Sequence, residues 1–273
     1  MGHVMTISFK ELQLPGLECS TEDGIGWLCM NRAPVNAMDM DFLHAFAKAV
    51  QVARNDAEVR VVVIASKAKN FFSAGLDLKE LDLMVDEGRA DLLDQVFKDG
   101  IIRGMRTARK IFIALVGGHC LGGGLELALA ADFRIGAHGK WQLGLPEVKL
   151  GGMPGGGGIQ TLRRLIGQSR ALRLAALGET IDPVRAHEYG ILDVIHPEEE
   201  AIRETTAFAA KFVQGAPQSI GAVKLALYEG MESTISEAMV LERQLYRAIM
   251  KSEDIKEGVA AFREKRPPKF TGR

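Results

Sequence analysis

Three consecutive glycines and a nearby glutamate form the part of the sequence best suited to chemistry. Gly122, Gly123 and Gly124 follow an apolar run typical of a buried strand, and Glu126 lies in the first turn of the helix predicted after them. The free N–H groups and the positive dipole end of a helix N-terminus stabilise a negative charge, whether a phosphate or an oxyanion. Glycines would let a ligand contact this backbone directly, although a tightly packed strand-to-helix turn explains them equally well.

A second bend of small residues follows another predicted buried strand, in the segment Phe72–Leu78. An oxyanion hole needs two N–H groups, and these can come from separate loops. This bend is therefore a candidate for the second donor, although an ordinary strand–helix connection is the more common explanation for such a segment. Its serine, Ser73, is not part of a GxSxG motif, which disfavours a serine hydrolase.

The second candidate glutamate, Glu147, lies between a strand predicted near Trp141–Leu143 and a further glycine-rich block, Gly151–Gly158. Burial in apolar surroundings raises the pKa of a carboxyl group and suits it to general acid–base catalysis. Either glutamate alone would more often cap a helix or form a salt bridge. The pair therefore indicates catalysis only if the fold brings Glu126 and Glu147 together.

The composition limits the classes of function. Lys and Arg total 34 against 35 for Asp and Glu, so the chain lacks the basic excess of a nucleic-acid-binding protein. Cys19, Cys29 and Cys120 are too scattered for a disulfide framework or a zinc site, and the histidines lack metal-binding spacing, so we expect no bound metal. The sequence has no GxxxxGK[ST] or GxGxxG motif, which argues against a nucleotide phosphate loop.

Glycine is the one unusual residue type. Of the 30 glycines, 14 lie between Gly117 and Gly158, which indicates one region where the backbone approaches something closely. No apolar run reaches the roughly 18–20 residues that span a bilayer, and the N-terminus lacks a signal-peptide pattern. We therefore expect no membrane association and a cytoplasmic location, where cysteines stay reduced.

The predicted elements favour an α/β fold. Strands are predicted over residues 7–12, 25–30, 60–66 and 111–116, with a hairpin turn at 22–24 and a helix over 40–54. A helical stretch is predicted from 79 to 109, broken near Gly88 and Gly100. From about Pro197 the pattern is entirely helical. We therefore predict an α/β core over residues 1–196 and a helical C-terminal module over 197–273.

Taken together, these motifs resemble the crotonase (enoyl-CoA hydratase/isomerase) family over essentially the whole chain. The matching stretches are Asn31–Met38, Phe72–Leu81, Gly118–Ala130, Asp132–Ile135, Gly144–Val148, Pro154–Gly158 and Glu257–Phe270. The resemblance implies a crotonase-like spiral of β-β-α turns, followed by a C-terminal helical trimerisation module that assembles homotrimers or dimers of trimers (homohexamers). It also implies an acyl-CoA substrate, with no cofactor beyond the coenzyme A that is part of that substrate.

The resemblance also implies a role for each site residue. The backbone N–H groups of Leu76 and Gly123 map to the two oxyanion-hole donors, and Glu126 and Glu147 map to the two glutamates that act on one water in the hydratase branch. The implied substrate-binding residues are Ala74, Gly75, Leu76, Asp77, Leu78, Gly122 and Gly123. Leu76 departs from the alanine of many hydratases, which a backbone donor tolerates and which changes the acyl pocket.

The resemblance therefore predicts a lyase that reversibly hydrates a trans-2-enoyl-CoA thioester to a 3-hydroxyacyl-CoA. The alternatives are an enoyl-CoA isomerase, another crotonase-fold acyl-CoA lyase or hydrolase with the same oxyanion hole, and, from a different class, a non-catalytic acyl-CoA-binding scaffold. The presence of both glutamates favours hydration. The acyl preference depends on the segment between about Asp82 and Arg109, for which the sequence makes no prediction.

Overall fold

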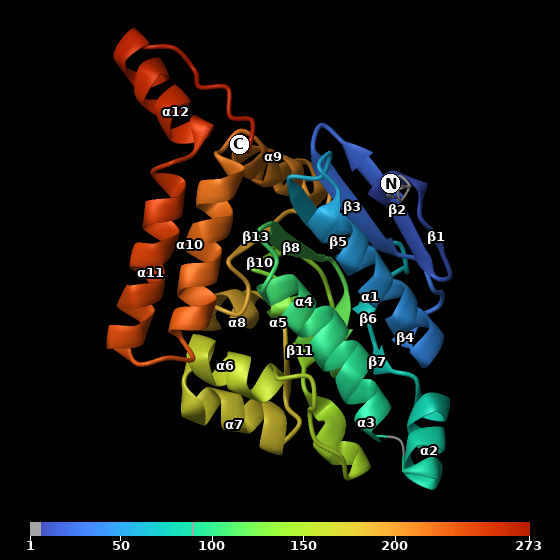
Figure 1. Ribbon diagram of the computed structural model, residues 1–273. Helices are drawn as coiled ribbons and strands as arrows, with labels where there is room; N and C mark the ends of the chain where they lie inside the picture. Colours follow the sequence, from blue (N-terminus) through green and yellow to red (C-terminus); the bar gives the residue numbers. More distant parts are fainter. Residues whose placement is uncertain (1–6, 89) are drawn as a thin grey trace, which may run out of the picture.

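The largest sheet has seven strands in the structure, a computed structural model that describes residues 7–88 and 90–273 (Figure 1). β2 is antiparallel to both of its neighbours, and each strand from β3 onward is parallel to the next. In spatial order the strands are β1 (Gln13–Leu14), β2 (Leu17–Glu22), β3 (Ile25–Met30), β5 (Val61–Ser66), β8 (Ile111–Val116), β10 (Phe133–Ala137) and β13 (Val194–His196).

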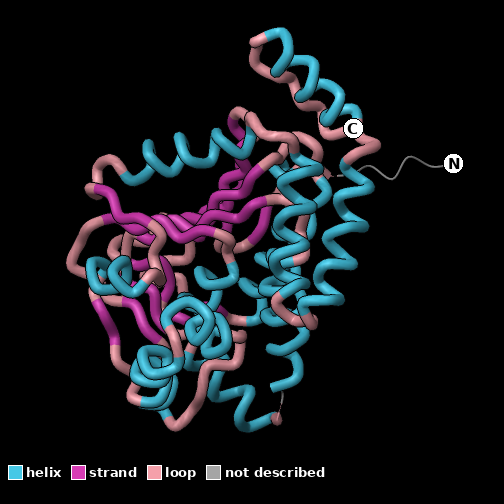
Figure 2. The backbone as a smooth tube through the Cα atoms, turned by 90° about the vertical axis from the view of Figure 1, so that its left-hand side faces the viewer, coloured by secondary structure: helices cyan, strands magenta, loops and turns pink. Residues whose placement is uncertain are grey.

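Short strands form two further sheets, and the strands appear as separate groups in Figure 2. The four-stranded sheet has the order β12 (Thr180–Ile181), β11 (Leu143–Gly144), β9 (His119–Leu121) and β6 (Phe71–Ser73), and the two-stranded sheet pairs β4 (Ala37–Met38) with β7 (Gly75–Leu76). β5, β8 and β10 of the large sheet are each followed by a strand of the four-stranded sheet and then by a helix. These helices are α2 (Leu78–Glu87), α5 (Gly123–Ala130) and the 3-10 helix η3 (Pro146–Leu150). The predicted α/β fold, with its spiral of β-β-α turns, is confirmed.

Helices cover both faces of the large sheet. Val62 and Ile64 of β5 pack in the cluster that contains residues of α1 (Met40–Asn55), whereas Val61 and Val63 pack in the cluster that contains residues of α9 (Ala201–Val213). Because side chains alternate along a strand, these two sets lie on opposite faces. Burial on both faces explains why β5 is a continuous apolar run.

The remaining helices surround the sheets or extend beyond them. α10, α11 and α12 stand at one side of the molecule in Figure 1, whereas α9, the first helix of the predicted C-terminal module, packs on the large sheet. The division at residue 196 stays a prediction. No helix in the described ranges is long and apolar enough to cross a membrane. The other helices are α3 (Ala90–Leu93), the π-helical segment η2 (Asp94–Ile102), α4 (Arg103–Arg106), α6 (Gly158–Ile166), α7 (Gln168–Ala176), α8 (Pro183–Tyr189), α10 (Pro217–Gly230), α11 (Ile235–Ile249) and α12 (Glu253–Glu264).

The strand predicted over residues 7–12 is wrong. A 3-10 helix, η1 (Phe9–Glu11), forms there because Ser8 and Glu11 make a capping box. Asp56 holds the segment in place, since its Oδ2 accepts hydrogen bonds from Ser8 Oγ (3.0 Å) and Phe9 N (2.6 Å). The antiparallel partner of β3 is therefore β2, joined to it by the predicted turn at 22–24.

Two other local predictions need correction. The predicted break near Gly88 is confirmed, because α2 ends there and Gly88 adopts φ 64°, but the predicted break near Gly100 is wrong. The second helical run passes through Gly100, where the missing side chain leaves room for Ala47 of α1. The strand predicted near Trp141–Leu143 begins only at Leu143. The indole Nε1 of Trp141 donates instead to the carbonyl oxygen of Ala137 at 3.0 Å, and this bond fixes the residue in the preceding loop.

A buried ion pair joins α10 to the rest of the fold. The ammonium group of Lys224 donates to Asp132 Oδ2 (2.7 Å), Met105 O (2.7 Å) and Lys110 O (2.8 Å), and Lys224 is 4% exposed. Asp132 also accepts a hydrogen bond from the N–H of Phe112 on β8. Burial disfavours both charges, so it raises the pKa of Asp132 and lowers that of Lys224, while their mutual attraction opposes both shifts.

Lys224→Met should lower the free energy of unfolding by about 3–5 kcal/mol, because it leaves a buried carboxylate without a cation. Urea denaturation at pH 7 measures this loss. The double variant with Asp132→Asn should recover part of it. Arg173→Met, which breaks the exposed pair with Glu179, should cost less than about 1 kcal/mol. Equal losses at the two sites would contradict the buried-pair interpretation.

Candidate active site

Two glycine loops approach each other closely where β7 meets the N-terminus of α5. A Cβ atom added to Gly75 would lie 2.9 Å from Leu121 O and 3.2 Å from Gly123 N. A Cβ atom added to Gly123 would lie 3.8 Å from the backbone nitrogen of Leu76. The backbone nitrogens of Leu76 and Gly123, which are the predicted oxyanion donors, are therefore brought together.

Glycine conformations make this approach possible. Gly75 has φ +98°, and Gly122, the residue before α5, has φ +54° and ψ −130°, a combination that residues with side chains rarely adopt. Gly123 is the first residue of α5, so its N–H has no acceptor within the helix and lies at the positive end of the helix dipole. Gly124 has a packing role, because a Cβ there would lie 2.7 Å from Ser73. The glycines thus combine tight packing with an exposed donor.

Glu126 is held inside this region by the second glycine block. Its carboxyl group is on the first turn of α5, the residue is 4% exposed, and Oε1 accepts a hydrogen bond from Gly158 N at 2.9 Å. Burial raises the pKa of Glu126, and hydrogen bonds from the N–H groups of Gly158, Gly156 and Gly155 oppose that rise. Cβ atoms at positions 156 and 158 would lie within 3.0 Å of the Glu126 side chain, so the block needs glycine to surround the carboxylate.

Glu147 approaches the same region from the first turn of η3. Its Oε1 lies 3.0 Å from the position that a Cβ on Gly122 would take. Its Oε2 is buried and has no hydrogen-bond partner. Burial, together with the negative charge of Glu126, raises the pKa of Glu147 to about 7. The two predicted glutamates are therefore close enough to influence each other's ionisation, which their sequence spacing did not reveal.

The arrangement combines three chemical capacities. Neighbouring N–H groups can stabilise a negative charge on a carbonyl oxygen. A carboxyl group with a pKa near 7 can exchange a proton at neutral pH. The unpartnered Oε2 atom of Glu147 is available to a substrate or a water molecule, as a buried polar atom without a partner is rare in proteins.

The other predicted substrate-binding residues surround β7. The N–H groups of Ala74 and Asp77 donate to Val35 O and Met38 O, both at 2.9 Å, so these two donors are occupied. The carboxylate of Asp77 accepts from Lys79 N at 2.9 Å and caps α2. Leu78 is 60% exposed, so its side chain lies at the surface.

Two apolar side chains at the site were missed by sequence reasoning. The Cε atom of Met38 lies 2.8 Å from the position of a Cβ on Gly123, and the ring of Phe97 lies close to the Cβ positions of both Gly123 and Gly156. Both residues are buried, at 2% and 4% exposure. In the sequence, Phe97 is one apolar residue in a helical pattern and cannot be distinguished from an ordinary core residue.

The chain is similar to known proteins over most of its length. Residues 20–273 match the family model described as enoyl-CoA hydratase/isomerase. The chain is 34% identical to a probable enoyl-CoA hydratase of Bacillus subtilis (94% of this chain, 98% of the relative) and 35% identical to the mitochondrial methylglutaconyl-CoA hydratase of Mus musculus (96% and 84%). The crystal structure of an enoyl-CoA hydratase from Geobacillus kaustophilus superposes with a TM-score of 0.91 at 35% identity, covering 96% of this chain and 98% of that one.

Gly75→Ala should lower activity about 100-fold, because the new Cβ would push the two loops apart and misplace the donors. Gly157→Ala is the matched control: Gly157 also has a positive φ, of 88°, but its Cβ position has no atom within 4 Å. Both variants should lose stability from backbone strain, and Gly75→Ala should lose more because its Cβ also contacts the facing loop. Steady-state kinetics and thermal unfolding of both variants test this, and equal activity in the two would refute it.

Glu147→Gln should change how stability depends on pH. A carboxyl group has a pKa near 4.3 in the unfolded chain, and that of Glu147 is about 7 in the folded protein. Between these values the folded state binds more protons, so this group makes the protein less stable as pH rises. The variant should gain about 1–2 kcal/mol relative to wild type between pH 4.5 and pH 8, allowing for partial exposure.

Urea denaturation across this pH range measures the gain. Glu58→Gln, at an exposed glutamate paired with Lys10, is the control and should show no comparable trend. A difference between Glu147→Gln and wild type that stays constant with pH would contradict the raised pKa.

Proposed function

Because the chain belongs to the enoyl-CoA hydratase/isomerase family, we propose that it reversibly hydrates a trans-2-enoyl-CoA thioester to a 3-hydroxyacyl-CoA. The observation that carries this proposal is the proximity of two carboxyl groups, one buried and one partly buried, to a pair of backbone donors from separate loops. Relatives named as hydratases of enoyl-CoA, methylglutaconyl-CoA and 2,3-dehydroadipyl-CoA support the reaction type.

In this proposal the N–H groups of Leu76 and Gly123 donate to the thioester oxygen. Hydrogen bonding to this oxygen draws electrons from the 2,3 double bond and makes C3 open to attack. The negative charge that develops on the oxygen is stabilised by donors already in place, and the helix dipole at Gly123 adds to this effect. Removing one such donor typically costs about 3–4 kcal/mol of transition-state stabilisation.

The two glutamates divide the proton transfers. Glu126, in its carboxylate form, takes a proton from the water whose oxygen bonds to C3. Glu147, in its protonated form, gives a proton to C2 as the double bond is lost. A pKa of about 7 for Glu147 supports this role, because the group is still substantially protonated at neutral pH. Dehydration of the 3-hydroxyacyl-CoA uses the same groups with the roles exchanged.

The substrate thioester is proposed to lie along the backbone from Ala74 to Leu78 and against Gly122 and Gly123. The reaction moves only protons and a water molecule, so it needs no redox partner and no cofactor beyond the coenzyme A of the substrate. A cytoplasmic location stays a proposal, supported by the three free cysteines.

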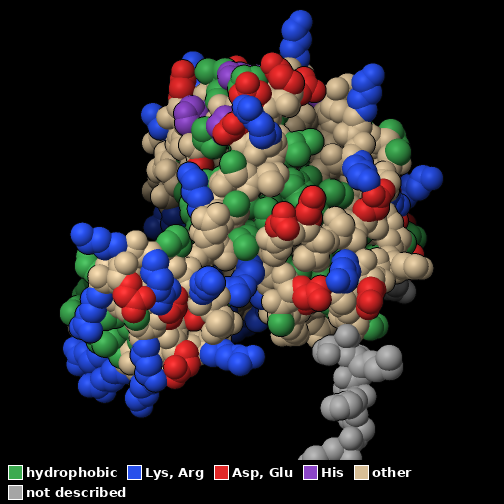
Figure 3. All heavy atoms as spheres, turned by 90° about the horizontal axis from the view of Figure 1, so that it is seen from above, with side chains coloured by type: hydrophobic (Ala, Val, Ile, Leu, Met, Phe, Trp, Pro, Cys, Tyr) green, Lys and Arg blue, Asp and Glu red, His purple; other side chains and the backbone are tan. Residues whose placement is uncertain are grey.

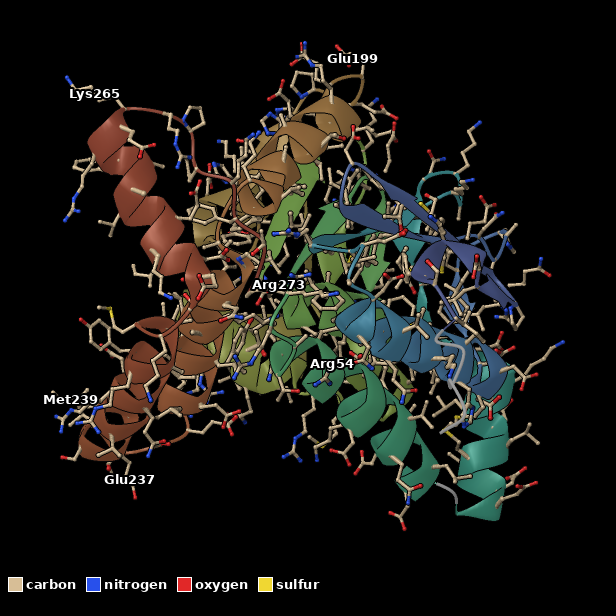
Figure 4. The ribbon with its side chains drawn as sticks, turned by 45° about the horizontal axis from the view of Figure 1, so that its top comes forward. Arg54, Glu199, Glu237, Met239, Lys265 and Arg273 are labelled. Carbon is tan, nitrogen blue, oxygen red and sulfur yellow. The ribbon has the colours of Figure 1, made fainter. Side chains whose placement is uncertain are left out.

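Assembly into trimers or dimers of trimers is also proposed, and the C-terminal helices support it. α11 has no buried residue, and Ile235, Met239 and Val240 are all more than half exposed. Met239 and Glu237 project from α11 at the left of Figure 4. The lobe at the lower left of Figure 3 is rich in Lys and Arg. The exposed apolar side chains of α11 are the better candidates for contact with another copy, because apolar surface is what such contacts bury.

Glu126→Gln and Glu147→Gln should each lower kcat for crotonyl-CoA hydration by about 100- to 10,000-fold with a smaller effect on KM, because each removes one proton transfer. Glu58→Gln, far from the site, should have no effect. The wild-type hydration rate should fall as pH rises through about 7, since Glu147 must be protonated, and this limb should be absent in Glu147→Gln.

Loss of the conjugated thioester absorbance measures hydration. An enoyl-CoA isomerase would instead create this absorbance from a 3-enoyl-CoA, and a non-catalytic scaffold would bind both thioesters unchanged. Unchanged kcat in Glu147→Gln would overturn the proposed role of that residue.

A further inference from the structure

The π-helical segment η2 places one aromatic ring at the centre of the site. Phe97 is 4% exposed, its Cε1 atom lies 2.4 Å from the position that a Cβ on Gly156 would take, and its Cζ atom lies 3.9 Å from the corresponding position on Gly123. The ring therefore extends from the proposed thioester donor to the second glycine block. Widened π-helical turns occur often at functional sites.

The ring of Phe97 lies next to the carboxylate of Glu126. Glu126 Oε2 lies 2.9 Å from the same Cβ position on Gly156 that the Phe97 ring approaches. If the thioester oxygen is bound by Gly123 N and C3 lies beside Glu126, the first carbons of the acyl group pass alongside this ring. Phe97 then forms one wall of the acyl site.

Phe97 is part of the packed hydrophobic core. Ile101 and Ile102, on the same π-helical segment, are 1% and 4% exposed and belong to the main hydrophobic cluster, as does Phe97. Met38 fills the neighbouring position beside Gly123 at 2% exposure. Because such interiors are close-packed, a long acyl chain could pass only if the ring moved.

We infer that Phe97 limits the length of the acyl chain, so that the enzyme prefers short-chain enoyl-CoA thioesters. This inference rests on the proposed function, because it takes the position of the acyl chain from the proposed roles of Gly123 and Glu126. It assigns Phe97 a role in specificity, and it leaves proton transfer to the glutamates.

The test compares Phe97→Ala with wild type on trans-2-enoyl-CoA thioesters of 4, 6, 10 and 12 acyl carbons. Wild type should have its highest kcat/KM at 4 or 6 carbons. In Phe97→Ala the ratio of kcat/KM for 10 carbons to that for 4 carbons should rise at least tenfold, since pocket contacts of a few carbons discriminate by such factors. A ratio within twofold of wild type, or a wild type that uses 12 carbons as well as 4, would overturn the inference.

Phe9→Ala is the matched control, because Phe9 is fully buried and lies beside Gly26 and Val59, away from the site. It should lose comparable stability and keep the wild-type chain-length ratio. If Phe97→Ala does not fold, Phe97→Leu serves instead, with an expected rise of at least threefold in the ratio for 10 against 4 carbons and the same twofold limit for rejection.

Binding separates failure of this inference from failure of the proposed function. Calorimetric titration with butyryl-CoA and decanoyl-CoA needs no turnover, and Phe97→Ala should bind decanoyl-CoA at least tenfold more tightly relative to butyryl-CoA than wild type does. A wild type that hydrates no enoyl-CoA while showing this change would refute hydration and retain the role of Phe97. A wild type that hydrates enoyl-CoA, with a binding ratio that Phe97→Ala leaves unchanged, would retain the proposed function and refute the role of Phe97.

Discussion

The whole site depends on how closely two stretches of backbone approach each other. Gly75 of β7 lies against the turn at Gly122 and Gly123 at a distance that leaves no room for a side chain. This contact holds two backbone nitrogens from loops almost fifty residues apart beside each other. It is sustained by the register of short strands, since β6 and β9 pair within one sheet and β4 pairs with β7. The two small sheets thus position the candidate donors, although they contain only short strands.

Burial around this contact then determines the protonation of the two carboxyl groups. Glu126 is buried and Glu147 is partly buried, and they also differ in their partners. Glu126 receives N–H groups from the second glycine block, which favour its ionised form, whereas one oxygen of Glu147 has no partner and its pKa rises to about 7. The difference in hydrogen bonding therefore separates a candidate base from a candidate acid.

The sequence allowed much of this arrangement to be predicted, because its strongest signals are local. The buried runs of β5 and β8 and the periodicity of α1 specify elements by side-chain pattern alone, and these predictions are confirmed within a residue or two. The proximity of Glu126 to Glu147 depends on tertiary packing, so spacing could not establish it. The strand prediction at η1 overlooked a local signal, the capping box of Ser8 and Glu11, while the other stabilising partner, Asp56, is more than forty residues away. Phe97 was missed because only its neighbours in space distinguish it from other core residues.

The ion pair of Lys224 has a consequence for how the chain can evolve. Its ammonium group donates to the carbonyl oxygen of Met105 on α4, which directly continues the π-helical segment that carries Phe97. It also donates to Asp132, which lies two residues beyond the helix that carries Glu126. One cation on α10 therefore contacts both the helical run that carries Phe97 and the residue two positions after the helix of the candidate base. The C-terminal helices cannot be exchanged freely, since a homologous helix lacking this lysine would leave the buried carboxylate of Asp132 without a cation beside the helix of the candidate base.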